Sequence, residues 1–267
     1  MKKQFLILSV VLLAALPAAA QTQQDTVFQK REVIIIDDDQ PIVTGETREV
    51  IVRDSRKVRV NYRKNGRMKF FNSIGLGYNG LVQGLDNLKL PEDAEWMDLE
   101  GKSINFNLML MSYQHNFGRH FGIQTGLELE VNNFRFSENV TPYRDPQTNY
   151  VGPNYLDYNL KKSKLVSSYL NVPLVVRVGI GSRNQLEVYG GIVGGWRWNS
   201  YTKLKSSEHG KDRNRDNLNL RNFHYGYTAG ITFHKVGFYA TYYPHSIFKA
   251  DKGPDVRQVN VGITFNY

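Results

Sequence analysis

The chain contains no cysteine among its 267 residues, and it contains no long apolar run after its first twenty residues. The missing cysteines exclude a disulfide framework, a thiolate metal site, a cysteine nucleophile and a lipid-modified N-terminal cysteine. The mean hydropathy is −0.44, and the body of the chain lacks the run of about 18 apolar residues that a membrane helix needs. A membrane β-barrel is still allowed, because its strands alternate apolar and polar residues and average to a low hydropathy.

The first twenty residues have the three parts of a secretory signal peptide. Lys2 and Lys3 precede an apolar stretch, and three consecutive alanines end it at position 20. The stretch is too short for a membrane anchor, and a proline interrupts it. We predict a cleaved signal peptide over 1–20, a periplasmic N-terminal arm over 21–66 and a folded body over 67–267.

The body consists of segments in which apolar and polar residues alternate with a period of two. Such alternation gives a β-strand one apolar face and one polar face. The eight segments are 69–79, 104–111, 121–132, 169–178, 186–198, 223–234, 236–243 and 259–267. Short connections alternate strictly with long polar ones. In an up-and-down barrel this arrangement puts every short turn at one end and every long loop at the other.

We therefore predict an all-β fold, an eight-stranded antiparallel up-and-down transmembrane β-barrel with a periplasmic N-terminal extension. Alternation alone does not say which face points outward. A soluble periplasmic ligand-binding barrel of the lipocalin type would turn its apolar face inward, and it is the alternative.

Three features favour an apolar exterior and a place in the outer membrane, in contact with its lipid and lipopolysaccharide. The polar faces carry five charged residues that suit a polar lumen: Arg177, Glu187, Arg197, Glu128 and Glu130. Aromatic residues gather near strand ends, as in an interfacial girdle: Trp196, Trp198, Tyr225, Tyr227, Tyr242 and Tyr243. The chain also ends with Phe265 and Tyr267 on its last apolar face. That ending resembles the C-terminal signal by which the barrel-insertion machinery recognises its substrates.

The stretch from Ser168 to Arg177 reads SYLNVPLVVR. It resembles the Tyr-Leu-x-aliphatic-Pro-aliphatic strand of the small PorT-like outer-membrane β-barrel proteins. The glycine-rich segment 74–78, the pair Gly190 and Gly191, and the aromatic C-terminus fit the same family, over about 67–267. The resemblance implies an outer-membrane barrel. Some members are implicated in protein secretion across the outer membrane, and most have no assigned role.

An eight-stranded barrel is narrow enough to be filled by its own side chains, so we do not expect a conducting pore. Charges in such a lumen must be paired. Reflecting one strand onto the next about a turn near residue 182 places Arg177 opposite Glu187, and we predict that ion pair. Arg197 is expected to meet Glu128 or Glu130.

The sequence gives no convincing sign of catalysis, of a cofactor or of a metal. His224 and His234 lie ten residues apart on one polar face, with no evident nucleophile beside either. The glycines of 75–80 match a dinucleotide-binding pattern, but no helix follows them. The acidic loop 81–101 does not have the spacing of an EF-hand. We predict a non-enzymatic accessory or structural component of an envelope or secretion assembly. An outer-membrane lipid-modifying enzyme is the least favoured alternative.

The N-terminal arm contains two near-copies of one short apolar run. The apolar residues are Val33, Ile34 and Ile35 in the first copy and Val50, Ile51 and Val52 in the second. Exposed β-type runs bind partners by adding a strand to a sheet edge, which makes a periplasmic protein partner one interpretation. A flexible tether or a small hairpin is the simpler one. Seven positive residues in 56–69 supply much of the net charge of +9, so the charge does not indicate nucleic acid.

Overall fold

The computed structural model describes residues 47–51, 57–61, 66–181, 185–207, 210–215 and 218–267. The chain divides into two compact units, and the boundary in the sequence falls between Lys64 and Asn65. In the first unit, β1 (Thr47–Ile51) and β2 (Lys57–Asn61) form a two-stranded antiparallel sheet. No helix in the described part of the chain is long and apolar enough to cross a membrane.

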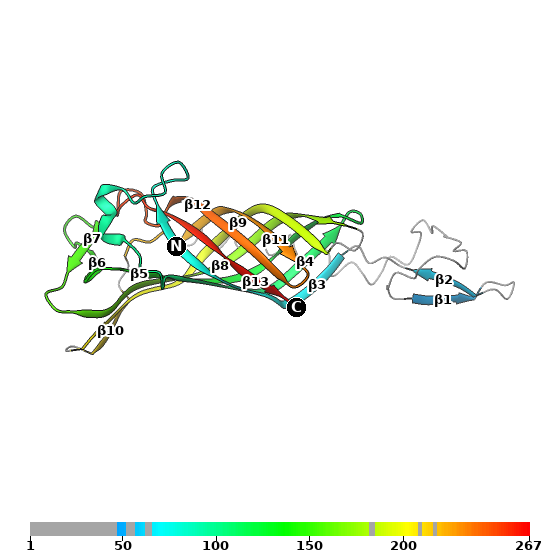
Figure 1. Cartoon of the computed structure of the whole chain (residues 1–267), viewed down its shortest axis with the longest axis horizontal. Helices are drawn as coiled ribbons and strands as arrows, with labels where there is room; N and C mark the ends of the chain where they lie inside the picture. The colour runs from blue at the N-terminus through cyan, green and yellow to red at the C-terminus, as the bar shows by residue number, and fades with distance from the viewer. Residues whose placement is uncertain (1–46, 52–56, 62–65, 182–184, 208–209, 216–217) are drawn as a thin grey trace, which may run out of the picture. The chain divides into compact units, whose positions relative to one another are not determined.

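The second unit is a closed ring of eight antiparallel strands, as predicted (Figure 1). The strands are β3 (Gly66–Val82), β4 (Ile104–Asn116), β5 (Phe121–Arg135), β8 (Leu160–Ile180), β9 (Leu186–Ser206), β11 (Phe223–Phe233), β12 (Val236–Ser246) and β13 (Arg257–Asn266). Each strand pairs with the next in this order, and β13 pairs with β3 to close the ring.

The apolar side chains of the strands point outward. On β8, Val172, Leu174 and Val176 are 47%, 49% and 43% exposed. Asn171, which directly precedes them and lies on the opposite face of the strand, is fully buried. Large apolar side chains repeated along a whole strand would be costly in water, so this face is suited to lipid. The lipocalin orientation is therefore wrong for this barrel, since it requires the apolar face to point inward.

The two ends of the barrel differ in their connections. The connections from β4 to β5, from β8 to β9 and from β11 to β12 are short and start from one end of the barrel, where the backbone N–H of Tyr267 also donates to the carbonyl of Asn72 at 3.0 Å. The described residues of the long connections, within 83–103, 136–159, 207–222 and 247–256, lie together at the other end (Figure 1). This is the outer-membrane arrangement of short periplasmic turns and long outer loops.

The outer loops have secondary structure and an apolar core of their own, although the sequence predicts polar loops. They contain the 3-10 helix η2 (Glu92–Met97), the hairpin of β6 (Val140–Arg144) and β7 (Val151–Tyr155), and β10 (Lys211–Asn214), which pairs with β9. Trp96, Phe136 and Phe248 are buried in this core, with the rings of Trp96 and Phe136 centred 6.0 Å apart. The polar residues of the loops surround a small set of apolar side chains that the alternation pattern does not reveal.

One turn shows how the loop structure is held. Between β6 and β7, the backbone N–H of Gln147 and the hydroxyl of Thr148 donate to the carboxylate of Asp145 at 2.9 and 2.8 Å. These hydrogen bonds favour the ionised form and hold the pKa of Asp145 below its usual value.

Two strands are much longer than the sequence predicts. Both β8 and β9 have 21 residues, whereas a tilted strand needs only about 9–11 residues to span the hydrocarbon layer. The extra residues lie at the loop end, where β8 and β9 remain paired from Leu160 and Ser206 inward. The two strands therefore extend beyond the membrane as a ribbon.

Candidate functional site in the barrel lumen

Polar side chains converge inside the barrel because strand alternation turns them toward the lumen and the register of the ring brings them to a similar depth. Asn105 on β4, Glu130 on β5, Asn171 on β8 and Asn260 on β13 all lie inside and are almost completely buried. Buried amides and carboxylates are costly unless they are hydrogen-bonded, so the arrangement of these groups decides what the lumen can do.

Glu130 is the centre of this group. Its two oxygens accept hydrogen bonds from six side chains: Asn171 at 2.5 Å, Tyr243 at 2.6 Å, Asn260 at 2.8 Å, Asn132 at 2.9 Å, Gln258 at 3.2 Å and Asn105 at 3.5 Å. All six are donors, which suits an ionised carboxylate, since that group only accepts. The network joins β4, β5, β8, β12 and β13 across the lumen. It satisfies Glu130 without any Lys or Arg partner among the described residues.

His224 is enclosed next to this network. Its Nε2 lies 2.7 Å from Oδ1 of Asn171 and 4.0 Å from Oε2 of Glu130. Its ring stacks between Tyr169 and Tyr243, with centroids 3.8 and 4.4 Å away. None of these neighbours is a serine or threonine nucleophile. His234 follows the opposite end of β11, with a φ of 53°, and the two histidines do not share a site.

Arg177 and Glu187 lie together near the short-turn end. Nε of Arg177 donates to Oε1 of Glu187 at 2.8 Å, and Nη2 of the same arginine contacts Oε2. The expected register is wrong by two residues, because Arg177 lies opposite Tyr189 and Glu187 lies opposite Gly179. The pair forms diagonally, which long side chains on neighbouring strands can do.

Arg197 meets neither Glu128 nor Glu130, so that prediction is wrong. Its guanidinium donates to Oγ of Ser200 and to Oδ1 of Asn222, both at 2.6 Å. Glu130 lies opposite Tyr169, and Tyr169 lies opposite Arg197. The arginine and the glutamate are thus separated by a whole strand, about 10 Å across two strand spacings, and by a buried tyrosine.

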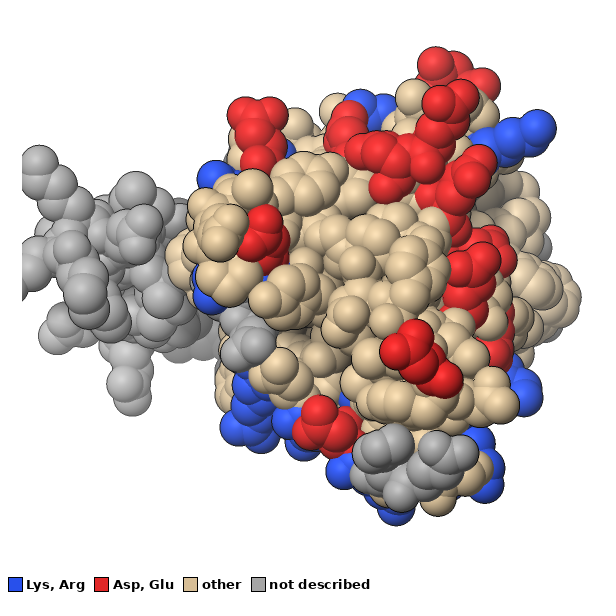
Figure 2. Space-filling view, turned by 90° about the vertical axis from the view of Figure 1, so that its left-hand side faces the viewer, with Lys and Arg blue, Asp and Glu red and all other residues tan. Residues whose placement is uncertain are grey.

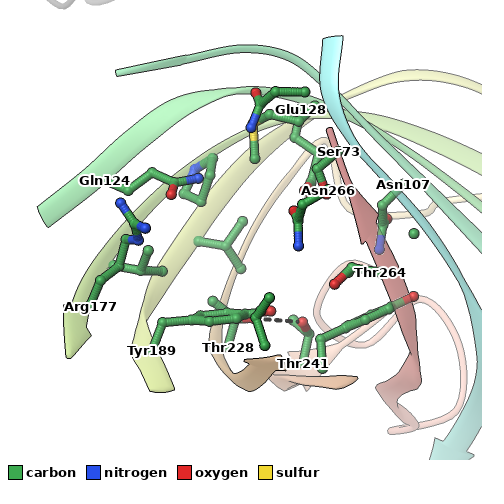
Figure 3. A pocket seen from close by; sticks show the side chains of 18 of the residues that line it. Ser73, Asn107, Gln124, Glu128, Arg177, Tyr189, Thr228, Thr241, Thr264 and Asn266 are labelled. Carbon is green, nitrogen blue, oxygen red and sulfur yellow. Dashed lines mark hydrogen bonds between the residues drawn. The ribbon is translucent and has the colours of Figure 1, made fainter. Parts of the chain in front are cut away.

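A cavity of about 250 Å³ occupies the lumen between the Glu130 network and the short-turn end. Glu128, Arg177, Tyr189 and Asn266 line it, with hydroxyl and amide groups around them (Figure 3). Its wall includes Thr241, which donates to Thr228 at 3.0 Å. No described residue of the outer loops lines it.

Tyr239 extends across the lumen at the edge of this cavity, because β3 has a glycine where the ring passes. Tyr239 donates to Oδ1 of Asn105 at 2.5 Å and passes over Gly77. A Cβ at Gly77 would lie 2.6 Å from the Tyr239 hydroxyl, closer than real Cβ contacts allow. This glycine therefore lets the ring cross the lumen, a role that its place on the polar face of the strand allows.

The arrangement offers ordinary hydrogen bonding but little other chemistry. Within the part of the chain that the structure describes, no three His, Asp or Glu side chains are grouped to hold a metal ion. The hydrogen-bond partners of Glu130 were not predicted from the sequence. Asparagines recur on the polar faces of several strands, and that recurrence is the one signal that could have indicated a network.

Four of the predicted girdle residues lie on the exterior. Trp196, Trp198, Tyr225 and Tyr227 are exposed to the outside, as a girdle requires. Tyr243 is not part of the girdle, because it points inward to Glu130 while the preceding residue points outward.

Phe265 and Tyr267 at the C-terminus are also exposed on the outside, at the short-turn end of the barrel. In the arm, Val50 and Ile51 belong to β1. Val33, Ile34, Ile35 and Val52 lie outside the described residues.

An apolar exterior, a polar lumen and loops of unequal length at the two ends define an outer-membrane β-barrel protein. The chain belongs to the family described as outer membrane protein beta-barrel domain, whose model matches residues 69–250.

Two solved structures of Ail from Yersinia pestis are similar. One is in complex with the heparin analogue sucrose octasulfate, at 14% identity over 76% of this chain and 97% of that chain, with a TM-score of 0.35. The other is the backbone structure in a phospholipid bilayer nanodisc, at 19% identity over 74% of this chain and 100% of that chain, with a TM-score of 0.31. A triple mutant of Rhodopseudomonas blastica porin is more distant, at 11% identity over 76% and 100% of the two chains and a TM-score of 0.17. No curated protein sequence matches the chain.

Proposed function

We propose that this outer-membrane barrel is a non-enzymatic, non-conducting accessory component of an envelope or secretion assembly. In this proposal the signal peptide 1–20 is removed on export, and the arm 21–66 contacts a periplasmic protein partner. The observation that carries the proposal is that the deepest polar groups of the lumen bind one another. Glu130 is satisfied by six donors and is not free to act on a substrate.

The surroundings of His224 argue against catalysis on lipid. A lipid-modifying enzyme needs a nucleophile and a histidine that open toward the bilayer. His224 faces the lumen instead, between two tyrosine rings, and its nearest polar groups are an amide and a carboxylate.

The arm supports an interaction role. β1 and β2 form a sheet of two strands, so each strand has a backbone edge that pairs with no other described strand. Unpaired strand edges are templates for strand addition by a partner. The resemblance of 168–177 to the PorT-like strand motif points the same way, since some members of that family take part in secretion.

The test compares three forms of the chain in intact envelopes after crosslinking and pull-down. They are the full mature chain, a form lacking 21–66, and a form in which 47–61 is a Gly-Ser linker of equal length. We expect the same periplasmic partners to be lost from both altered forms while the barrel remains folded. Folding is checked by the heat-dependent shift of the band on a gel. An unchanged set of partners in both altered forms would refute the docking role.

A further inference from the structure

Four neighbouring strands bring basic residues into register at the loop end of the barrel. Arg135 on β5 lies opposite Lys164 on β8, Lys164 lies opposite Lys203 on β9, and Lys203 lies opposite Arg213 on β10. A second row follows two residues further out, where Lys162 lies opposite Lys205 and Lys205 lies opposite Lys211. We call these seven residues the basic rows.

Like charges directly opposite one another on paired strands destabilise a sheet, and acidic neighbours offset little of that cost here. Arg135 pairs with Glu100 at 2.8 Å, and Nζ of Lys164 donates to Oδ1 of Asn133 at 2.5 Å. No lysine of the basic rows forms an ion pair with another described residue. The charged groups that act on Lys164 are all cations: Lys162, Lys203, Arg135 and Arg213. Apart from Glu100 beside Arg135, the rows therefore have no counter-ion among the described residues.

The basic rows lie on the same face of the sheet as the lipid-facing residues. On β8 the exposed apolar residues have even numbers, such as Val172 and Leu174, and Lys164 keeps that parity. On β9 the outward-facing residues have even numbers up to Trp198. A register shift opposite Ser168 and Tyr169 changes this, so that beyond it the odd-numbered Tyr201, Lys203 and Lys205 face outward.

The guanidinium of Arg213 covers the Tyr201 ring at 3.6 Å, just beyond the tryptophans. Aromatic belts mark the interface between hydrocarbon and headgroups. The basic rows thus begin where the headgroups of the outer leaflet lie.

We infer that the basic rows bind the phosphate groups of lipid headgroups in the outer leaflet. A row of four strands spans about 14 Å, which suits a headgroup with more than one phosphate. Figure 2 shows Lys and Arg gathered along the lower rim of the loop end, the side where Figure 1 places β10. Acidic side chains gather on the upper and right rims instead. Because the rows continue the lipid-facing surface, a membrane lipid fits them better than a soluble polyanion does.

The test measures binding of bisphosphorylated lipid A to the detergent-solubilised mature chain by native mass spectrometry. Dephosphorylated lipid A serves as the reference lipid. The variant is Lys162→Gln, Lys164→Gln and Lys203→Gln combined, and the matched control is Lys89→Gln, Lys102→Gln and Lys252→Gln on other outer loops. We expect the variant to bind the phosphorylated lipid about fivefold less tightly per lysine removed, or about 1 kcal/mol each. The control should bind like the unaltered chain.

Equal binding of the two lipids by the unaltered chain would overturn the inference, as would an equal loss in the variant and the control. Heparin, a soluble polyanion, is titrated in parallel. A variant that loses heparin binding but keeps lipid A binding would also overturn it. Should the triple variant fail to fold, Lys205→Gln with Lys211→Gln changes two lysines that are exposed at the end of the ribbon. That pair should give a smaller loss of lipid A binding in the same direction.

Discussion

At the scale of single residues, Glu130 sets the most specific expectation for stability. Glu130→Gln would replace one of the two accepting oxygens by an NH2 group, which is a donor and would face other hydrogen-bond donors. A buried donor left unsatisfied costs about 1–3 kcal/mol, so we expect the free energy of unfolding to fall by that amount. Equilibrium urea unfolding in detergent micelles measures the loss.

Glu128→Gln is the matched control, since Glu128 lies two residues away on the same strand and lines the cavity. We expect it to cost clearly less than Glu130→Gln. Equal losses for the two substitutions would contradict the central role of the network.

The ion pairs show what a single sequence can say about a residue's partner. The turn between β8 and β9 is short, so reflection about it brings Arg177 close to Glu187 even with an error of two residues. Arg197 is in the same register as Arg177 and lies opposite the buried Tyr169 on β8. Reflection about the turn relates β9 only to β8, so it does not give the distance from Arg197 to Glu130 on β5. Three partners of Glu130 come from the distant strands β12 and β13, and their depth in the lumen depends on the register of the whole ring.

At the scale of elements, the end of β13 sets an expectation for assembly. Phe265 and Tyr267 point outward, while Asn266 between them lines the cavity. If the two aromatic residues form the signal for the insertion machinery, Phe265→Ala with Tyr267→Ala should lower the folded fraction in the outer membrane severalfold. The control Asn266→Ala should leave it near the unaltered level. The heat-dependent gel shift of envelope fractions gives the folded fraction, and an equal effect of both changes would count against the signal.

All eight strands could be predicted, because a membrane barrel repeats the same two-residue alternation in each of them. Their outer ends could not be predicted. Beyond the bilayer, β8 continues as Leu160–Lys164, where polar residues occupy both faces and the alternation fades. The loop core was missed for a related reason, since Trp96 with Met97 and Ile247 with Phe248 are short apolar pairs in polar segments. Only their contacts across distant loops reveal that they belong together.

At the scale of the whole barrel, the lumen sets an expectation for transport. The loop core and the Glu130 network occupy the outer part, and all the described residues that line the cavity belong to strands or short turns. We expect the purified chain to produce no steps of conductance in planar bilayers at high salt. Regular steps of constant size would mean that a water path continues past Glu130.

The three tryptophans divide between two surroundings, and this gives the molecule an optical signal for each stage of its own assembly. Trp96 is buried in the loop core, whereas Trp196 and Trp198 are exposed on the lipid side. Lipids that carry bromine on their chains quench only indole rings that touch them. In such lipids the emission of Trp196 and Trp198 should fade as the strands insert. The emission of Trp96 survives and shifts to shorter wavelength when the loops close, so one fluorescence trace separates insertion from closure.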